Sequence, residues 1–465
     1  MADDPKIRVA VVGAGPAGFY ATDRLLRSGD VEVELFDRLP TPWGLVRAGV
    51  APDHPKIKSV TRVFEKTAKL EGFRFHGNVE VGADITHDEL LEHHHAVIYT
   101  YGAAKDRRLG IPGEDLPGSV PATEFVAWYN GHPDAVHHEF DLTGPRAVVI
   151  GNGNVAVDVA RMLMLTQEEL AVTDTADEAI EAFAASGITE VVVLGRRGPA
   201  QAAYTTPELR ELGEMQDADV FVDPADVELD AASAAWLASD DADRTSRDNV
   251  DIVRDYAARA PHGHGRRIAL RFLRSPVEIL GEDQVTGVRV VRNELIADES
   301  GNIRAHHTQD EEVIDCTLVL RSVGYRGVGI EGLPFDERSG TIVNDDGRVL
   351  TAAGGAQLPG VYTAGWIKRG PSGVIGTNKK CAHETAQHLL DDREAGRLPQ
   401  PPHGAAELDA LLADRGATLV DYAAWERIDE HERAAGDAQG RPRVKLTRRE
   451  ELLERGLGER SGGPA

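Results

Sequence analysis

Two short β-branched runs, each leading into a glycine-rich turn, constrain the fold of this chain more than any other feature. The run Ile7–Val12 (IRVAVV) precedes Gly13–Gly18 (GAGPAG), and the run Arg146–Ile150 (RAVVI) precedes Gly151–Ala156 (GNGNVA). Glycines at this spacing allow a tight turn, a close approach of backbone to a pyrophosphate, and close packing of helix on strand. The chain therefore carries two candidate dinucleotide cradles.

Further β-branched runs indicate parallel sheets around these cradles. Strands are predicted at Val31–Phe36, Ala96–Thr100, Glu190–Leu194, Leu318–Ser322 and Gly360–Ala364, with helices between several of them. Strands that alternate with helices form doubly wound sheets covered by helices. We therefore predict an α/β fold with two Rossmann-like dinucleotide-binding domains.

The order of these segments predicts that the second domain is inserted into the first. A chain of 465 residues exceeds one ordinary core, and turns follow the predicted strands near residues 104–108 and 323–327. We place one domain at residues 1–105 and 325–465, and the other at residues 106–324.

Composition excludes several classes of protein. The two cysteines, Cys316 and Cys381, lie far apart, which argues against a disulfide framework, a redox Cys-x-x-Cys pair or an iron–sulfur cluster held by this chain. The net charge of −26 repels nucleic acid and anionic membranes. We find neither a secretory signal nor an apolar run near the ~20 residues of a membrane helix, so we expect a cytoplasmic protein.

The first cradle has the acidic partner expected of a nucleotide site. The predicted strand after it ends in Asp37, 24 residues beyond Gly13, where a carboxylate binds the ribose. Pro16 suits the start of the following helix because its missing N–H costs nothing there. The alternative, a glycine turn without a ligand, explains the turn but not the acid in register with it.

The second cradle favours NADPH over NADH. The strand after it, EVVVLG, ends in Arg196 and Arg197 instead of a carboxylate, and paired guanidinium groups hold a 2′-phosphate that a carboxylate would repel. Arg196 follows Gly151 by 45 residues instead of about 20, and the excess at residues 166–187 is predicted to be a helical insertion. Two solvated surface arginines are the alternative.

Four longer blocks resemble one known family. They are residues 39–56 (LPTPWGLVRAGVAPDHPK), 148–161 (ending GNGNVAVDVAR), 195–212 (GRRGPAQAAYTTPELREL) and 365–380 (GWIKRGPSGVIGTNKK). Together they look like adrenodoxin reductase and its bacterial counterparts, most of all the actinobacterial ferredoxin–NADP⁺ reductases of this type. The likeness runs from about residue 7 to about residue 458 and includes the tail RPRVKL.

The resemblance implies a set of cofactor contacts and a catalytic pair. For FAD it implies Gly13, Gly15, Ala17, Gly18, Asp37, Leu45, Val81, Trp366, Gly373, Val374 and Ile375. For NADP it implies Arg107, Asn152, Gly153, Asn154, Val155, Arg196, Arg197, Glu208 and Gly373. His54 and Glu208 match the family's pair near the nicotinamide–flavin junction, and Asp158 matches a further acid of its motif. No metal site is implied: the run His93–His95 is predicted to be a loop before a buried strand.

Some of these residues have an ordinary structural alternative, and two depart from the family pattern. Trp366 could be a core tryptophan, His54 a residue with a loop hydrogen bond, and Glu208 an exposed carboxylate at a helix start. Asp37 replaces a longer glutamate, and Tyr204 stands where phenylalanine is usual.

The function implied is an NADPH-dependent flavoprotein reductase that reduces a ferredoxin-type iron–sulfur protein. The alternatives left open are a flavin monooxygenase with a small-molecule acceptor and a non-catalytic flavoprotein that senses NADPH. Ferredoxins are usually acidic, so an acidic chain needs a local basic docking surface. We place it on residues 244–274, which hold eight arginines against three acids, at Arg244, Arg247, Arg254, Arg259, Arg266 and Arg267, and we expect a monomer.

Overall fold

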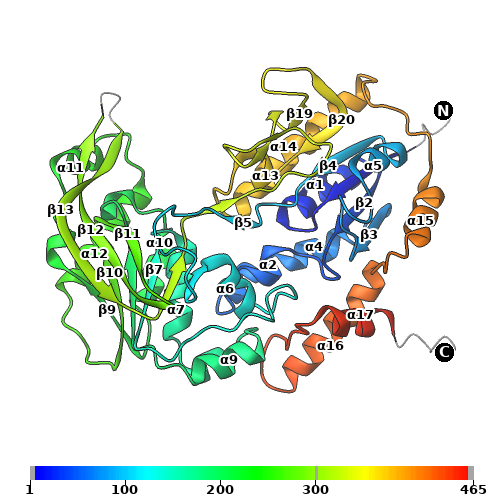
Figure 1. Ribbon diagram of the computed structural model, residues 1–465. Coiled ribbons are helices and arrows are strands. Elements are labelled where there is room, and N and C mark those ends of the chain that lie inside the picture. The colour runs from blue at the N-terminus through cyan, green and yellow to red at the C-terminus, as the bar shows by residue number, and fades with distance from the viewer. Residues whose placement is uncertain (1–5, 299–301, 459–465) are drawn as a thin grey trace. The chain divides into compact units, whose positions relative to one another are not determined.

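The structure is a computed structural model that describes residues 6–298 and 302–458. The chain divides into two compact units, Met1–Lys105 with Gly324–Ala465, and Asp106–Val323. These limits lie within one residue of the domain boundaries predicted from the sequence. Each unit is described by itself below (Figure 1).

The first unit is built on a seven-stranded sheet with the strand order β18-β19-β20-β4-β1-β2-β3. The strands from β20 to β3 run parallel, and β18 and β19 extend the sheet in antiparallel fashion. The strands of this sheet are β1 (Ile7–Val12), β2 (Val31–Asp37), β3 (Phe73–Gly77), β4 (Ala96–Tyr99), β18 (Asn344–Asp345), β19 (Arg348–Leu350) and β20 (Gln357–Thr363). Outside it lie the short strands β15 (Tyr325–Arg326), β16 (Phe335–Asp336) and β17 (Thr341–Ile342).

Successive side chains of each buried strand point to opposite faces of this sheet. Both faces are therefore apolar, and helices cover them. Val9 and Val11 of β1 join one apolar cluster, and Ala10 and Val12 join another. The helices are α1 (Pro16–Leu26), α2 (Leu45–Ala48), α3 (Pro55–Lys58), α4 (Thr61–Thr67), α5 (His87–His93), α13 (Trp366–Arg369), α14 (Ile375–Glu394), α15 (Ala405–Asp414), α16 (Tyr422–Asp437) and α17 (Arg449–Leu457).

The second unit is built on a fully parallel sheet with the order β6-β14-β7-β8-β10-β9. A separate antiparallel sheet, β11-β12-β13, stands beside it. The strands are β5 (Lys105–Asp106, where the chain enters the unit), β6 (Ser119–Pro121), β7 (Arg146–Ile150), β8 (Glu190–Leu194), β9 (Ala218–Val222), β10 (Arg266–Arg271), β11 (Arg274–Gly281), β12 (Val285–Ala297), β13 (Ile303–Asp315) and β14 (Leu318–Arg321).

The two faces of this parallel sheet are covered differently. Helices pack on one face around Val149 and Val193, and the antiparallel sheet packs on the other around Val148 and Val192. The helices are α6 (Ala122–Tyr129), α7 (Asn154–Met164), α8 (Gln167–Leu170), α9 (Asp177–Ala184), α10 (Thr206–Leu212), α11 (Ala231–Ala238) and α12 (Arg244–Ala258), with 3₁₀ turns at Pro199–Gln201 and Pro224–Asp226.

These sheets confirm the predicted α/β class with parallel, doubly wound architecture. The insertion before β8 is helical as predicted, because it forms α8 and α9. Of the histidine run, His94 and His95 form the predicted loop before β4, whereas His93 is the last residue of α5. Both cysteines are buried thiols. In the described part of the chain, no helix combines the length and the apolar character that a membrane span requires.

The core of the second unit contains a tyrosine hydroxyl that lacks a hydrogen-bond partner among the described residues. Tyr204 is 2% exposed, and burial raises the pKa of its phenol well above the usual value. The nearby Tyr256 is also buried, but its hydroxyl donates to the Leu209 carbonyl at 2.8 Å. An unpartnered buried hydroxyl costs stability, whereas a satisfied one does not.

We predict that Tyr204→Phe stabilises the protein by about 1 kcal/mol, which raises the melting temperature of a unit of this size by roughly 2–4 °C. Thermal unfolding followed by circular dichroism measures the change. Tyr256→Phe is the matched control and should lower the melting temperature, because the Leu209 carbonyl loses its donor. Equal destabilisation by both substitutions would contradict the prediction.

Candidate cofactor-binding sites

The first glycine turn is shaped by three glycines with different roles. Gly13 has a φ of +105°, and a Cβ there would lie 2.7 Å from the Cα of Tyr101. A Cβ on Gly18 would lie 2.0 Å from the Gly13 carbonyl oxygen. Gly15 has an ordinary φ of −82°, and a Cβ there would meet no protein atom within 4 Å. The turn and the packing of α1 therefore require Gly13 and Gly18, while Gly15 leaves open backbone at the start of α1.

Asp37 lies beside this turn at the end of β2, as the sequence predicts. Its Oδ2 accepts the Ala14 N–H at 2.8 Å, and its Oδ1 accepts the Leu39 N–H at 2.9 Å. Burial raises the pKa of Asp37, and these two backbone donors oppose that rise. Each carboxylate oxygen keeps a second acceptor position, so the side chain can bind a ribose hydroxyl while it braces the turn.

A second helix start lies in the same unit. Helix α14 packs along α1 (Figure 1), and neither helix has an acidic residue in its first turn. Gly373 precedes α14 with a φ of +78°, and the N-cap residue Val374 is 53% exposed. Leu45, which opens α2, is 41% exposed. Two helix N-termini and two uncovered apolar side chains suit an anionic ligand with a flat apolar ring system.

Trp366 opens α13 directly after β20 and is half-buried instead of being a core residue. Its ring lies 5.3 Å from that of Tyr325. The buried indole N–H has no hydrogen-bond acceptor among residues 6–298 and 302–458. A Cβ on Gly365 would lie 2.7 Å from the Ala17 Cβ, so that glycine brings α13 against α1. An unsatisfied donor beside the first cradle fits a ligand that carries acceptors.

The second glycine turn repeats this arrangement. Gly151 has a φ of +142°, and a Cβ there would lie 2.1 Å from the Ser322 carbonyl oxygen. Gly153 is extended, and its nearest neighbour would be the Ala203 Cβ at 4.0 Å. Ala156, in the third position of the motif, is fully buried. The second cradle therefore also exposes backbone at the start of its helix, α7.

The asparagines of the second cradle bind the loop at residues 203–205, a contact that the sequence did not predict although this loop lies in the block 195–212. The Asn152 carbonyl accepts the Ala203 N–H at 2.8 Å, and Asn154 Oδ1 accepts the Thr205 N–H at 2.7 Å. Gly195 also belongs here, because a Cβ there would lie 2.7 Å from Asn152 Nδ2. Gly195, which follows β8, could have indicated a close contact, but no sequence pattern identifies Asn152 as the residue it contacts.

Arg196 and Arg197 follow β8 and form a cationic pair. Arg196 is exposed and Arg197 is half-buried, with an Nη2 bond to the Gln201 carbonyl at 3.4 Å. Burial and the charge of Arg196 both lower the pKa of Arg197. No carboxylate in the described residues pairs with either guanidinium group. Such a pair favours an anion with more than one charge, and a phosphate monoester has this property.

Glu208 is buried instead of being an exposed helix-start carboxylate. It is 8% exposed in the first turn of α10, and its Oε2 lies 3.8 Å from Nη1 of Arg161. Arg161 is itself buried and also pairs with Asp158 at 2.9 Å and Glu211 at 3.5 Å. The structure thus brings together Glu208 and Asp158, which the sequence singled out separately.

The other predicted cofactor residues are placed as follows. His54 is 7% exposed and immediately precedes α3, where its backbone N–H donates to Ala51. Val81 is half-buried and forms a β-bridge with Ile85. Arg107 is exposed at the start of the second unit.

The proposed docking arginines have internal contacts. Arg244 lies 3.5 Å from Asp248, and Arg254 lies 3.9 Å from Asp251. The others contact backbone, an aromatic ring or an acid: Arg247 with Leu237 and Ser239, Arg259 with Tyr256, Arg266 with Met164, and Arg267 with Glu190. Because the Arg244 and Arg254 side chains are 92% and 50% exposed, their ion pairs are weak and exchangeable.

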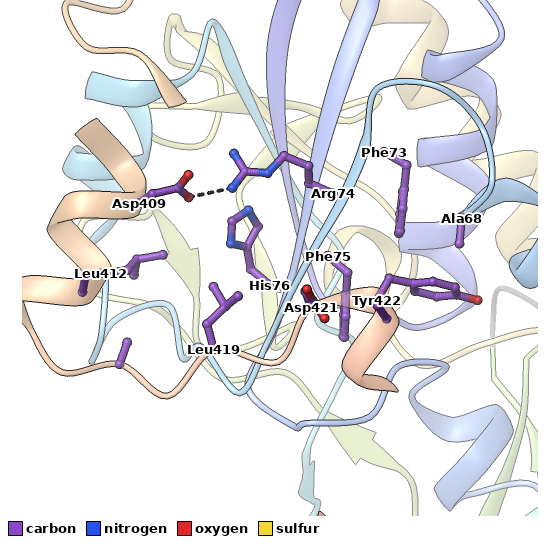
Figure 2. Close-up of a pocket in the computed structure, with 13 residues that line it drawn as sticks. Ala68, Phe73, Arg74, Phe75, His76, Asp409, Leu412, Leu419, Asp421 and Tyr422 are labelled. Carbon is purple, nitrogen blue, oxygen red and sulfur yellow. Dashed lines mark hydrogen bonds and ion pairs between the residues drawn. The ribbon is translucent and has the colours of Figure 1, made fainter. Parts of the chain in front are cut away.

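A cavity of about 580 Å³ lies elsewhere in the first unit, along the edge strand β3 (Figure 2). Arg74 in this cavity donates to Asp409 at 2.6 Å and to Glu34 at 2.9 Å. Burial tends to raise the pKa of Glu34, but hydrogen bonds from His76 and His94 lower it overall. Arg74, the one arginine among the described residues that line the cavity, is already paired with two carboxylates, so this cavity does not suit a phosphate.

Comparison with known proteins confirms the resemblance seen in the sequence blocks. Residues 7–192 match the family model of pyridine nucleotide-disulphide oxidoreductases. The chain is 50% identical to NADPH-ferredoxin reductase FprA of Mycobacterium leprae, with 97% of this chain and 98% of that protein covered. It is 39% identical to the mitochondrial NADPH:adrenodoxin oxidoreductase of Arabidopsis thaliana, with 96% and 95% covered. The solved structure of Mycobacterium tuberculosis FprA in complex with NADPH has a TM-score of 0.92, at 49% identity, and covers 97% of this chain and 100% of that one.

The open backbone at Gly15 and Gly153 predicts two separable binding defects. Alanine fits the protein at both positions, so we expect Gly15→Ala and Gly153→Ala to fold with near-normal melting temperatures. Each added methyl group lies where a pyrophosphate would approach. Gly15→Ala should reduce bound FAD, measured by absorbance after desalting, and Gly153→Ala should raise KM for NADPH by about tenfold or more, a loss of ~1.4 kcal/mol. Loss of the same cofactor in both variants would contradict the assignment.

Proposed function

Because the chain belongs to the NADPH–ferredoxin reductases of the adrenodoxin-reductase type, we propose that it moves hydride from NADPH to FAD and then single electrons to a ferredoxin-type iron–sulfur protein. The observation that supports this most directly is the pair of glycine cradles: the second is followed by two adjacent arginines, Arg196 and Arg197, that have no carboxylate partner among the described residues. One cradle thus suits a dinucleotide with free ribose hydroxyls and the other a 2′-phosphorylated one.

We assign FAD to the first unit. The starts of α1 and α14 would hold its phosphates and ring through backbone N–H groups, Asp37 would bind its ribose, and Leu45 and Val374 would cover its apolar surface. Trp366 offers its indole N–H to an acceptor on the same ligand. When bound, FAD supplies the conversion between two-electron and one-electron transfer.

We assign NADPH to the second unit. Arg196 and Arg197 hold the 2′-phosphate, and the start of α7 holds the pyrophosphate, so binding energy from the distant end of the nucleotide positions its reacting end. We retain His54 and Glu208 as the candidate catalytic pair. Glu208, held by Arg161, orients the nicotinamide end, and His54 tunes the flavin site or carries a proton.

An anaerobic titration tests this function. NADPH should bleach the visible absorbance of the purified yellow protein, and a ferredoxin added afterwards should be reduced, while NADH should act far less well. Arg196→Ala and Arg197→Ala should each raise KM for NADPH about 10- to 100-fold, because a charge-assisted phosphate contact contributes roughly 1.5–3 kcal/mol, and should leave KM for NADH unchanged. Flavin that NADPH fails to bleach would favour a sensor, and NADPH oxidation that depends on oxygen and a small substrate would favour a monooxygenase.

We propose that the iron–sulfur partner docks on the second unit near Arg244, Arg254 and Arg259. Within the described chain, Arg244 and Arg254 form weak ion pairs and Arg259 contacts an uncharged ring. These guanidinium groups can therefore bind an acidic protein instead. We propose a monomer that works in the cytoplasm.

Reversal of charge at two of these positions tests the docking surface. Arg254→Glu with Arg259→Glu should lower the rate of ferredoxin reduction about tenfold or more at low salt and flatten its salt dependence. Ferricyanide reduction should stay unchanged, since a small acceptor needs no docking. Arg304→Glu with Arg338→Glu is a control pair of exposed arginines outside the surface, and an equal effect of both pairs would refute it.

A further inference from the structure

The tail motif RPRVKL, at residues 441–446, has no part in the function proposed above. In the structure it follows α16 and returns along that helix (Figure 1). The Val444 N–H donates to the Glu432 carbonyl at 2.9 Å, and the Leu446 N–H donates to the Glu432 side chain at 2.9 Å. Glu432 therefore anchors the tail to α16.

Glu432 also binds Arg47 of α2, the short helix that lies beyond the first cradle in the sequence. It is fully buried, and its two oxygens accept Nη1 and Nη2 of Arg47 at 2.7 and 2.6 Å. Nη1 of Arg443, in the tail motif, donates to it at 3.0 Å. Burial tends to raise the pKa of Glu432, but the charges of Arg47 and Arg443 lower it overall. The carboxylate stays ionised and forms a bidentate link between residues 385 positions apart.

Two tryptophans complete this cluster. The Arg47 guanidinium lies over the Trp425 ring at 5.4 Å, and the Arg443 guanidinium lies over the Trp43 ring at 5.4 Å. The two indole rings meet edge to face at 4.9 Å. Lys445 adds a bond from its Nζ to the Arg47 carbonyl at 3.1 Å. We call the C-terminal members, Trp425, Glu432, Arg443 and Lys445, the C-terminal clamp.

The residues that the clamp holds lie against the first glycine turn. The backbone N–H of Trp43 donates to the Ala14 carbonyl at 2.8 Å, and a Cβ on Gly44 would lie 3.0 Å from the Cα of Gly15. Trp43 has a φ of +84°, a conformation that a bulky residue adopts only when its surroundings impose it. The clamp supplies those surroundings, because it packs on the Trp43 ring and fixes Arg47 four residues later.

We propose that the C-terminal clamp positions the segment Trp43–Arg47, which contains the start of α2, against the first glycine turn and thereby controls how tightly the protein holds FAD. The clamp residues are positioning residues that act through Gly44 and Trp43 on the cradle. The inference rests on the proposed assignment of FAD to the first unit.

A matched pair of ion-pair substitutions in the full-length holoprotein tests the proposal. Arg47→Lys keeps the charge but loses the bidentate link to Glu432. Arg348→Lys makes the same change to a similar pair in the same unit, in which Arg348 binds the buried Asp392 at 2.9 and 3.0 Å near the far end of α14. Lys445→Met removes the bond to the Arg47 carbonyl but keeps the Arg47–Glu432 ion pair, and it serves as the second variant if Arg47→Lys does not fold.

The readouts are the melting temperature, the visible circular dichroism of bound FAD, and the rate of FAD release after dilution, followed by the rise in flavin fluorescence. We expect release at least tenfold faster in Arg47→Lys and severalfold faster in Lys445→Met, with an altered dichroism band. Arg348→Lys should lower the melting temperature as Arg47→Lys does but change release less than threefold.

Equal acceleration in Arg47→Lys and Arg348→Lys, in proportion to the loss of stability, would overturn the proposal, and so would unchanged release in Arg47→Lys and Lys445→Met. Wild-type protein without FAD that cannot be reconstituted would instead overturn the proposed function, and the clamp's role in FAD binding with it.

Discussion

The close approach of backbone to backbone at each glycine turn is the constraint on which each unit depends. A single methyl group at Gly18 would lie 2.0 Å from the Gly13 carbonyl oxygen, and one at Gly151 would lie 2.1 Å from the Ser322 carbonyl oxygen. No side chain fits at either position, so helix α1 packs on the turn after β1, and the turn after β7 packs on the end of β14. Neither α1 nor α7 has a side-chain cap among the described residues, which leaves their first N–H groups available to the anionic ligands that we propose.

The placement of individual charges says more about this protein than its net charge does. The net charge is −26, yet the buried carboxylates Glu432 and Glu34 are each met by basic groups on several sides, since an unpaired buried charge would be costly. Arg196 and Arg197 show the opposite arrangement, with two like charges side by side and no carboxylate partner in the described chain. We propose that a phosphate bound between the two guanidinium groups relieves this repulsion and so favours a phosphorylated nucleotide.

Local signals in the sequence predicted much of the fold and of both cradles. The strands at Val31–Asp37 and Glu190–Leu194 lie where β-branched runs placed them, and Asp37 lies where its distance from Gly13 placed it. Contacts between distant segments left no such signal. No sequence pattern near Arg47 predicts its ion pair with Glu432, and none near Glu208 predicts its burial against Arg161. Both contacts depend on how separate helices pack. A turn can be predicted because the residues that form it are adjacent in the sequence. A buried ion pair cannot be predicted in this way, because its two residues are far apart and share no sequence pattern.

The nested order of the chain has a consequence for biosynthesis. Strand β20 neighbours β4 in the sheet of the first unit, and α14 packs along α1, yet both are encoded after the whole second unit. A ribosome that adds about 5–20 residues per second needs roughly 20–70 s to pass from β1 to β20. During that interval the first cradle is a sheet fragment with an uncovered edge, while the second unit can already close. The second glycine cradle can therefore form before the sheet that carries the first cradle is complete.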